Sequence, residues 1–389
     1  MGNHSASRRV KGEIIRFRQT YLKRKIQHIH SLGILDKHSV IHYFRKFNPD
    51  TWHLVKNFHE EYSRLEKRRI KNKKKSVYAF HNVEDFFWNY AKFVGSGNFP
   101  HLQEEEKELE IQNLLKHGKE RSLKLCNAET NRNRLLQTAT PKYSNYYENT
   151  YFYLRKRFPR DIDSRYIILH EAAKYKCNLS ISFLHKINAC ERNAALRKFA
   201  YDSLLRLGYT DTRLCRKCKG KKRETDSFVY TPITTPQELI KRIYNSPLEQ
   251  MKQYDVFLSH SYRDKDNLVK IKERLNQLNL NVYLDWVNDK DELQRCLACA
   301  ETASVLVERI KSSQSILYIH TKDSLNSHWT PWELGLAYAL KKKIGVLYQD
   351  SSHEVPEYLK LYQTVTFEDG SFFVQEDNHK IPFKDWIQE

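Results

Sequence analysis

The sequence predicts two parts, a mostly helical N-terminal region and a C-terminal α/β domain with a parallel sheet. Up to about residue 225, apolar residues recur at helical spacing, and from residue 254 short apolar runs alternate with amphipathic segments. The length of 389 residues also favours more than one domain. We expect a helical region over 1–225, a linker with a short helix over 226–250, and the α/β domain over 251–389.

The helices of the N-terminal region follow from the spacing of its apolar residues. A long polar helix is expected over 102–123, and the Thr- and Asn-rich stretch 127–142 is expected to be a loop. Shorter helices are predicted over 151–158, 164–175, 180–187 and 192–207. The last of these has a clear apolar stripe, and Gly208 follows it as a C-terminal cap.

The C-terminal part alternates strands with helices. Strands are predicted over 255–258, 281–284, 315–319, 344–348 and 365–367, with helices over 264–278, 293–310 and 331–340. Thr235 and Pro236 open a further short helix ahead of the first strand. Strands joined by helical crossovers form a parallel sheet with helices on both faces, and its ligands bind beyond the carboxyl ends of the strands.

Composition excludes several classes of protein. With 40% hydrophobic residues the chain can bury a core, which excludes wholesale disorder. No run approaches eighteen apolar residues, and the first residues form no secretory signal, so we predict a cytoplasmic protein without membrane contact. Seven cysteines without an export signal predict free thiols or metal ligands and not disulfides.

Positive charge is concentrated in the N-terminal part. Residues 1–250 hold 50 Lys and Arg against 26 Asp and Glu, whereas residues 251–389 hold 17 against 21. Basic runs lie at 67–75 and 216–223, and a basic stretch at 155–157 follows Tyr143, Tyr146, Tyr147, Tyr151 and Tyr153. Aromatic rings among cations suit single-stranded nucleic acid. The alternative is a solvated helical face with tyrosines in the core.

Common catalytic and metal-binding signatures are missing. The sequence has no Walker A motif, no Gly-x-Ser-x-Gly elbow and no zinc-protease motif. Cys215-x-x-Cys218 would supply half of a zinc site, but no second close pair of ligands accompanies it. Two thiols in a basic loop is therefore the favoured interpretation, and no metal is predicted.

The segment Ser327–Gly335 has two interpretations. Locally, Thr330 is a good N-cap, Pro331 fits the first helical position, and Glu333 completes a capping box. On the pattern alone, this structural role is favoured over a role in chemistry.

Four segments in order resemble those of the TIR (Toll/interleukin-1 receptor) domain. They are Tyr254–His260, Val282–Trp286, Ile310–Ile319 and Ser327–Leu334. The Pro-Trp-Glu-Leu-Gly sequence looks like the bacterial group. The resemblance covers about residues 252–370 and implies a flavodoxin-like sheet. Many bacterial members cleave NAD⁺ at the nicotinamide–ribose bond, so the resemblance also implies that activity, with NAD⁺ as substrate and no cofactor.

The resemblance further implies the residues of the site. Glu333 falls on the catalytic carboxylate of the family's Trp-x-x-x-Glu motif, and Trp329, one helical turn earlier, would be its aromatic partner. The nucleotide pocket would be lined by the end of the first strand and by the start of the loop after the second strand. These residues are Phe257, Ser259, His260, Ser261, Tyr262, Asp285 and Trp286.

The chemistry implied for Glu333 is physically sound. Nicotinamide in NAD⁺ is cationic and leaves as a neutral base, so no general acid is required, unlike in glycosidases with two carboxylates. One carboxylate would bind the ribose hydroxyls and stabilise an oxocarbenium-like transition state, and a Trp face would bind the cation or stack on a base. No metal is needed.

The sequence therefore predicts a TIR NAD⁺ glycohydrolase whose product is either ADP-ribose or a cyclic isomer. We expect an effector of bacterial antiphage defence that is inactive until a phage-derived or nucleic-acid trigger binds the N-terminal region and the chains assemble as a homo-oligomer. Two alternatives stand beside this prediction. One is a non-catalytic TIR scaffold that recruits partners, and the other is a nucleic-acid-binding protein with a regulatory TIR domain.

Overall fold

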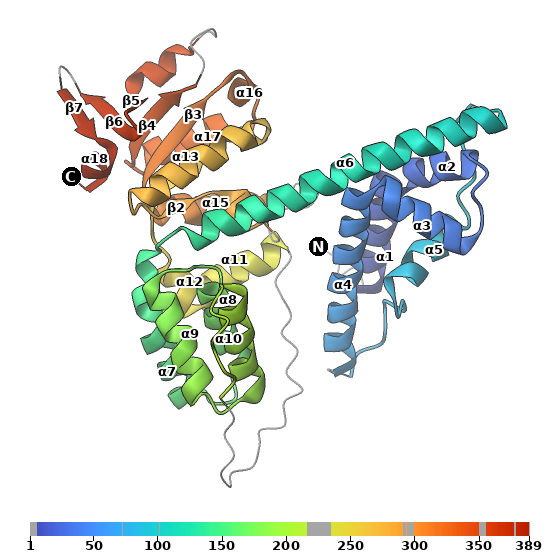
Figure 1. Ribbon diagram of the computed structural model, residues 1–389, viewed down its shortest axis with the longest axis horizontal. Helices are drawn as coiled ribbons and strands as arrows, with labels where there is room; N and C mark the ends of the chain where they lie inside the picture. Colours follow the sequence, from blue (N-terminus) through green and yellow to red (C-terminus); the bar gives the residue numbers. More distant parts are fainter. Residues whose placement is uncertain are drawn as a thin grey trace. The chain divides into compact units, whose positions relative to one another are not determined.

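The structure divides into two compact units, Met1–Thr130 and Asn131–Glu389. The computed structural model describes residues 6–71, 73–100, 102–215, 235–290, 293, 299–349, 355–376 and 379–388. The helix α6 (Glu104–Gln137) runs through the boundary and belongs to both units (Figure 1). Within the described ranges, no helix is both long and apolar enough to cross a membrane.

The first unit is a set of helices around an aromatic core. Its elements are α1 (Ala6–Phe17), the π-helical turn η1 (Arg18–Leu22), α2 (Lys23–Ser31), α3 (Lys37–Phe47), α4 (Pro49–Lys71), α5 (Val83–Ala91) and the first part of α6. Phe44, Phe86 and Phe87 are fully buried at its centre. Before α5, the side chain of Asn82 accepts a hydrogen bond from the amide of Asp85 and caps the helix.

The helix α6 is longer than the sequence predicts. The helix expected over 102–123 continues to Gln137, so the prediction of a loop over 127–142 is wrong for residues 127–137. Leu135 and Leu136 lie in this stretch and are buried in the core of the second unit. Burying an apolar side chain contributes about 1.5–3 kcal/mol, several times the helix-propensity cost of one Asn or Thr. Packing therefore outweighs the local sequence preference.

The second unit begins with a layer of short helices. These are the 3₁₀ turn η2 (Lys142–Tyr146), α7 (Tyr147–Arg157), α8 (Ile162–Ala172), α9 (Asn178–Cys190), α10 (Ala194–Arg206), α11 (Pro236–Asn245) and α12 (Pro247–Met251). The predicted helices over this region are present with shifted ends. Gly208 has a φ of +95° just after α10, as predicted for a C-terminal cap. Thr235 caps α11 by accepting a hydrogen bond from the amide of Glu238.

The rest of the second unit is an α/β domain with a seven-stranded sheet. Its strands are β1 (Tyr254–Ser259), β2 (Val282–Tyr283), β3 (Ser313–His320), β4 (Lys343–Tyr348), β5 (Gln363–Glu368), β6 (Ser371–Glu376) and β7 (His379–Pro382). Its helical elements are η3 (Tyr262–Asp264), α13 (Lys265–Gln277), α14 (Asp285–Asn288), α15 (Ala300–Lys311), α16 (Lys322–Leu325), α17 (Trp329–Ala339), η5 (Glu357–Leu361) and α18 (Phe383–Gln388).

The order of the strands is that of a flavodoxin-like fold. The order β2-β1-β3-β4-β5 is parallel throughout, as predicted, and β6 and β7 extend the sheet as antiparallel strands. Helix α13 covers one face, and α15 and α17 cover the other (Figure 1). The helical region followed by an α/β domain confirms the predicted fold class.

Two details of the α/β domain differ from the prediction. The hairpin β6–β7 and α18 were not predicted, although Phe372, Val374 and Trp386 in them are buried and complete one side of the core. The helix expected over 293–310 begins as α15 at Ala300, and residues 294–298 lie outside the described residues.

The helical layer and the sheet share one core. Tyr143, Tyr147 and Tyr151 are fully buried, and Tyr143 packs edge-on against a tyrosine of β1 with ring centroids 6.3 Å apart. The core interpretation is therefore right for these three tyrosines, whereas Tyr146 and Tyr153 are half exposed. Because they share this core, the helical layer and the α/β domain belong to one compact unit, which begins at Asn131. The predicted domains are a different partition, and their boundaries near 225 and 250 stay a prediction.

Candidate active site

The polar residues expected at the carboxyl ends of the strands lie at that edge of the sheet. Strand β1 ends at Ser259, and α14 follows β2 by one residue and carries Asp285 and Trp286. Helix α17 brings Glu333 to the end of β1, although 74 residues separate it from Ser259 in the sequence. The structure therefore brings together Ser259, Asp285 and Glu333, three of the residues predicted for the site.

Glu333 is a buried carboxyl group held by a buried serine. Its residue is 7% exposed, and the hydroxyl of Ser259 donates a hydrogen bond of 2.6 Å to Oε2. Burial raises the pKa of Glu333 to about 8, the hydrogen bond from Ser259 opposes the rise, and the charge of Asp285 adds to it. At neutral pH and without a ligand, most of this carboxyl is therefore protonated.

The capping-box interpretation of Glu333 is wrong. Helix α17 begins at Trp329, one residue before the expected cap Thr330, and the hydroxyl of Thr330 donates to a carbonyl of α16 at 3.0 Å. The hydroxyl of Ser327 instead accepts hydrogen bonds from the first amides of α17, at 3.3 and 3.4 Å. With the helix start satisfied in this way, Glu333 is free to contact Ser259.

Two tryptophans stand close to Glu333 on α17. Trp329 is 39% exposed and Trp332 is 38% exposed, and their rings meet edge to face with centroids 5.7 Å apart. Both rings are therefore open to a ligand from solvent. Trp332 was not predicted as a site residue, although the Trp-x-x-Trp-Glu spacing was a signal that could have found it.

A second polar pair links the end of β1 to α14. The Nε2 atom of His260 lies 3.6 Å from Oδ1 of Asp285, and its Nδ1 atom lies 3.1 Å from the carbonyl oxygen of Leu258. The contact between Nδ1 and that carbonyl fixes the orientation of the ring, so that Nε2 faces Asp285. The side chain of Asp285 is 40% exposed, so this pair borders solvent.

The other residues predicted for the pocket have different surroundings. Phe257 is 2% exposed and stacks on a tyrosine of β2 in the core, with ring centroids 5.3 Å apart, and Ser261 is buried. The indole nitrogen of Trp286 is buried and has no hydrogen-bond partner among the described residues. The side chain of Tyr262 lies outside the described residues. The binding roles of these residues stay predictions.

The described residues offer no metal site. No three His, Cys, Asp or Glu side chains in this part of the chain are placed to hold an ion. Cys215 is exposed, and Cys218, the other member of the predicted pair, lies outside the described residues, as does the rest of the basic run over 216–223.

Comparison with known proteins identifies the C-terminal region and its relatives. Residues 256–380 match the TIR domain family. The putative cyclic ADP-D-ribose synthase TIR2 of Cytobacillus dafuensis is 28% identical over 319 residues, which cover 79% of this chain and 81% of that protein. The probable 3′ cyclic ADP-D-ribose synthase ThsB′ of Bacillus cereus (strain MSX-D12) is 29% identical over 175 residues, which cover 42% of this chain and 90% of that protein.

A solved structure of a TIR domain is among those found to be similar. It is the crystal structure of the TIR domain of the Toll-related receptor TRR-2 of Hydra magnipapillata, with a TM-score of 0.24 and 16% identity over 29% of this chain and 84% of that chain. The sequence similarity to the Cytobacillus protein covers far more of the chain than the α/β domain alone. It therefore extends into the N-terminal helices.

Proposed function

We propose that this chain, whose residues 256–380 are a TIR domain, cleaves NAD⁺ at the nicotinamide–ribose bond and that Glu333 is its catalytic residue. The observation that carries the proposal is the place of Glu333, a buried carboxyl at the carboxyl end of β1 within 2.6 Å of the Ser259 hydroxyl. The names of the two bacterial relatives, both cyclic ADP-D-ribose synthases, support a cyclic ADP-ribose as the product.

The reaction needs little from the protein beyond electrostatics. The electron pair of the C1′–N bond goes to the pyridinium nitrogen, and nicotinamide leaves as a neutral molecule. The ribosyl cation is then captured by water, which gives ADP-ribose, or by a nucleophile of the same nucleotide, which gives a cyclic isomer. A proton is released in either case, and no metal or cofactor takes part.

Glu333 stabilises positive charge on the ribose when it is ionised. A carboxylate in a site from which water is excluded acts strongly on nearby charge, because the surroundings are poorly polarisable. The cationic nicotinamide ring would itself favour ionisation of Glu333 on binding, since an opposite charge nearby lowers the pKa of a carboxyl. Trp329 and Trp332 offer exposed aromatic faces for the rings of the dinucleotide.

The test is to incubate the purified full-length chain with NAD⁺ and to follow free nicotinamide and the nucleotide product. Glu333→Gln should lower kcat by about a hundredfold or more, the loss typical when one group that stabilises transition-state charge is removed. The matched control is Glu357→Gln, since Glu357 has a side chain 84% exposed and pairs with Lys360 three residues later, which is also exposed.

Misfolding would not explain this loss. The pKa of Glu333 is raised by burial, so ionisation opposes burial, and an amide in its place should keep or raise the melting temperature. No turnover by the wild-type chain, even when it is clustered on a support, would favour a non-catalytic scaffold instead.

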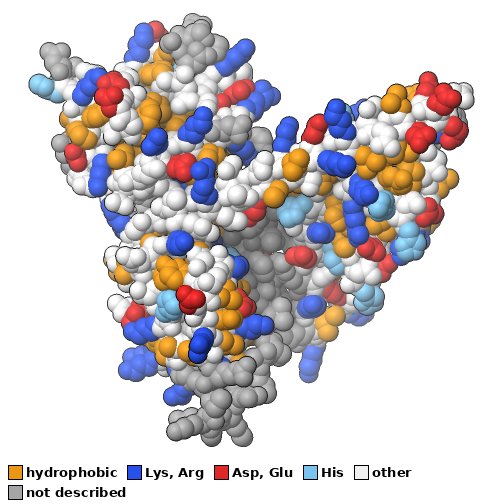
Figure 2. Space-filling view, viewed as in Figure 1, with side chains coloured by type: hydrophobic (Ala, Val, Ile, Leu, Met, Phe, Trp, Pro, Cys, Tyr) orange, Lys and Arg blue, Asp and Glu red, His pale blue; other side chains and the backbone are white. Residues whose placement is uncertain are grey.

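We also propose that the N-terminal region regulates this activity in the cytoplasm of a bacterium, through assembly in response to a trigger in antiphage defence. Support comes from the charge contrast between the two parts of the chain. Tyr146 and Tyr153 offer exposed rings for a nucleic-acid trigger, but on the face in Figure 2 Lys and Arg side chains are dispersed and form no single stripe. Turnover per chain that is independent of chain concentration would contradict activation by assembly.

A further inference from the structure

We propose that α14 (Asp285–Asn288) is held in place from outside the TIR domain, by Arg132 of α6 and by Glu249 of α12, and that this hold positions the first residue of α14 beside Glu333. Arg132 contacts α14 directly, whereas Glu249 acts through Arg309. These are positioning residues and not catalytic ones. The inference rests on the proposed function for its effect on turnover, but the hold itself is a property of the fold.

The position of α14 matters because of what it carries. Asp285 begins the helix, faces His260 across 3.6 Å, and is one of the charges that act on Glu333. Trp286 follows, with Lys265 of α13 over its ring at 5.2 Å. A displacement of α14 would therefore change both the charge and the aromatic surface at the edge of the site.

The helix α14 is too short to hold itself in place. It is a single turn of four residues, and its last backbone bonds run from the amides of Val287, Asn288 and Asp289 to the carbonyls of Leu284 and Asp285. Forming a single helical turn restricts several backbone dihedral angles but makes few hydrogen bonds. Such short helices are therefore stable only when other elements fix them. Contacts from outside α14 must therefore set its place.

The first contact comes from α6. The guanidinium of Arg132 donates a hydrogen bond of 2.8 Å from Nε to the carbonyl oxygen of Val287, 155 residues away in the sequence. Carbonyls at the end of a helix lack partners within the helix, and a cation there is favoured by the helix dipole. Arg132 lies outside residues 256–380, so the donor is not part of the TIR domain.

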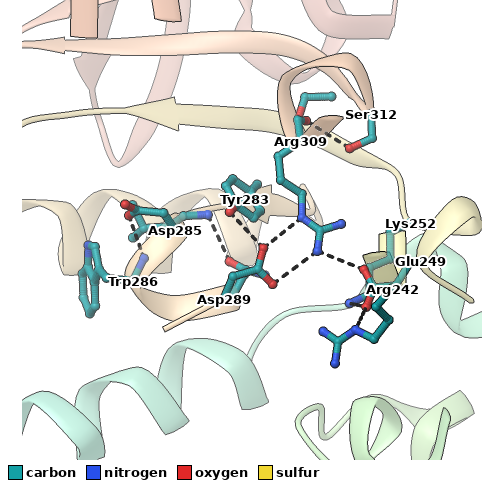
Figure 3. Close-up of polar contacts among 12 residues, drawn as sticks. Arg242, Glu249, Lys252, Tyr283, Asp285, Trp286, Asp289, Arg309 and Ser312 are labelled. Atoms are coloured by element: carbon teal, nitrogen blue, oxygen red, sulfur yellow. Dashed lines mark hydrogen bonds and ion pairs between the residues drawn. The ribbon is translucent and has the colours of Figure 1, made fainter. Parts of the chain in front are cut away.

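The second contact is a buried ion cluster at the residue that follows α14 (Figure 3). Asp289 directly follows the helix, and Arg309 donates to it from Nε at 2.9 Å and from Nη2 at 3.3 Å. The Nη2 atom of Arg309 also donates to Glu249 at 2.9 Å, and the hydroxyl of Tyr283 donates to Asp289 at 3.0 Å. Asp289, Arg309 and Glu249 are each at most 4% exposed.

This cluster fixes distances tightly because it is buried. Moving any one member would leave a charge without a partner in a region that excludes water, which costs several kcal/mol in typical proteins. Glu249 also pairs with Arg242 at 3.2 Å and with Lys252 at 2.9 Å, and Lys252 pairs with Glu171 of α8 at 3.2 Å. The ion pairs thus run without a break from the helical layer to the end of α14.

The test compares two neighbouring arginines of α6 in the full-length chain. Arg132→Ala removes the donor to α14, whereas Arg134→Ala removes an ion pair of 2.9 Å with Glu273 of α13, another contact between α6 and the α/β domain. Hydrogen exchange of the peptide that covers residues 285–289 reports on α14 without any substrate. Nicotinamide release from NAD⁺ reports on the site.

Arg132→Ala should raise the exchange rate of the 285–289 amides by about tenfold, as expected for the loss of one hydrogen bond from a charged donor. It should lower kcat/KM by roughly tenfold, since a misplacement of about 1 Å can cost a hundredfold in rate. Arg134→Ala should change neither measurement by more than about twofold. Arg132→Lys keeps a donor and should recover part of both losses.

Unchanged exchange at 285–289 in Arg132→Ala would overturn the inference, whatever happens to turnover. Equal increases in Arg132→Ala and Arg134→Ala would also overturn it, because the effect would then reflect general docking of α6. Raised exchange in Arg132→Ala alone, in a chain whose wild type releases no nicotinamide, would support the hold on α14 and would count against the proposed function instead.

Discussion

The chemistry proposed for this chain depends on a single proton on Glu333. The neutral carboxyl tolerates burial, but only the carboxylate can stabilise a ribosyl cation. The hydroxyl of Ser259 favours the ionised form because it donates to the carboxyl oxygen. Ser259 is therefore placed to set how much of the free enzyme is ready to react at a given pH.

We predict that kcat/KM for NAD⁺ rises with pH through about 8 and is level above it. The pKa of Glu333 is raised to about 8, so the reactive carboxylate is the minor form at pH 7 and becomes the major form only at higher pH. The measurement is nicotinamide release at low NAD⁺ between pH 6 and pH 9.5. A profile that is flat or falls over this range would contradict the role given to the carboxylate.

Ser259→Ala should move that profile to higher pH, because it removes the hydrogen bond that lowers the pKa of Glu333. The matched control is Ser315→Ala. Ser315 is also fully buried, but its hydroxyl donates to the carbonyl of Asp255 in β1 at 2.8 Å and has no bond to Glu333. A midpoint that moves equally in both variants would show a general effect of removing a buried hydroxyl.

At the scale of single residues, the sequence pattern alone favoured a capping role for Glu333 over a role in chemistry. Thr330, Pro331 and Glu333 fit a capping box, and only the order of four segments along the chain, which resembles the TIR domain, favoured chemistry. The structure contradicts the capping role, because the hydroxyl of Ser327 satisfies the first amides of α17. The partnership of Glu333 with Ser259 could not be predicted from spacing, since 74 residues lie between them.

At the scale of elements, two glycines in helices are expected to respond in opposite ways to substitution by alanine. In α6, a Cβ on Gly118 would lie 1.9 Å from the carbonyl oxygen of Lys46 at the end of α3, where Arg121 also donates to the carbonyl of Phe47 at 2.9 Å. In α17, a Cβ on Gly335 would meet no other atom within 4 Å. Gly118 is therefore needed for close packing, whereas Gly335 is not.

Gly118→Ala should lower the free energy of unfolding by about 1–3 kcal/mol, the usual cost of overpacking, despite a gain of about 1 kcal/mol in helix propensity. Gly335→Ala gains the same propensity without a clash and should raise it by up to about 1 kcal/mol. The measurement is urea unfolding of both variants and the wild type. A Gly118→Ala variant that is as stable as the wild type, or more stable, would contradict the close approach of α6 to α3.

The elements that the sequence predicted well are those with strong local signals. Alternating strands and helices predicted the parallel sheet, and Thr235 and Gly208 marked helix ends correctly. The hairpin β5–β6 was missed, although Asp369 and Gly370 form an Asp-Gly turn with φ values of +49° and +79°, which is a recognised hairpin signal. The full length of α6 had no local signal, because packing of its last turns stabilises it.

At the scale of the whole chain, the basic character of the N-terminal part is partly used inside the protein. Arg242 lies in that part and, together with Lys252 and with Arg309 of α15, neutralises the buried carboxylate of Glu249. These partners are separated by up to 60 residues in the sequence, so no composition argument could have paired them. The same ions join the helical layer to the α/β domain, and the two should therefore unfold together.

We predict that Glu249→Ala lowers the free energy of unfolding by about 3–5 kcal/mol at pH 7, the usual cost of removing one partner of a buried ion pair. Burial opposes ionisation of Glu249, but Lys252, Arg242 and Arg309 outweigh it and hold its pKa well below the usual range. Because the pKa of Glu249 is depressed in the folded protein, its contribution to the free energy of unfolding is complete above the pKa of the unfolded state, near 4.5. That contribution is lost as the pH falls below this value.

The difference between Glu249→Ala and the wild type should therefore be full at pH 7 and should shrink as the pH falls from about 4.5 towards 2. Urea unfolding at a series of pH values, followed by both tryptophan fluorescence and helical circular dichroism, measures it. The control Glu357→Ala, at an exposed pair, should cost less than about 1 kcal/mol at any pH. If Glu249→Ala splits the single transition of the second unit into two, the ion cluster is what makes the helical layer and the TIR domain one cooperative body; if it costs no more than Glu357→Ala, apolar packing alone joins them.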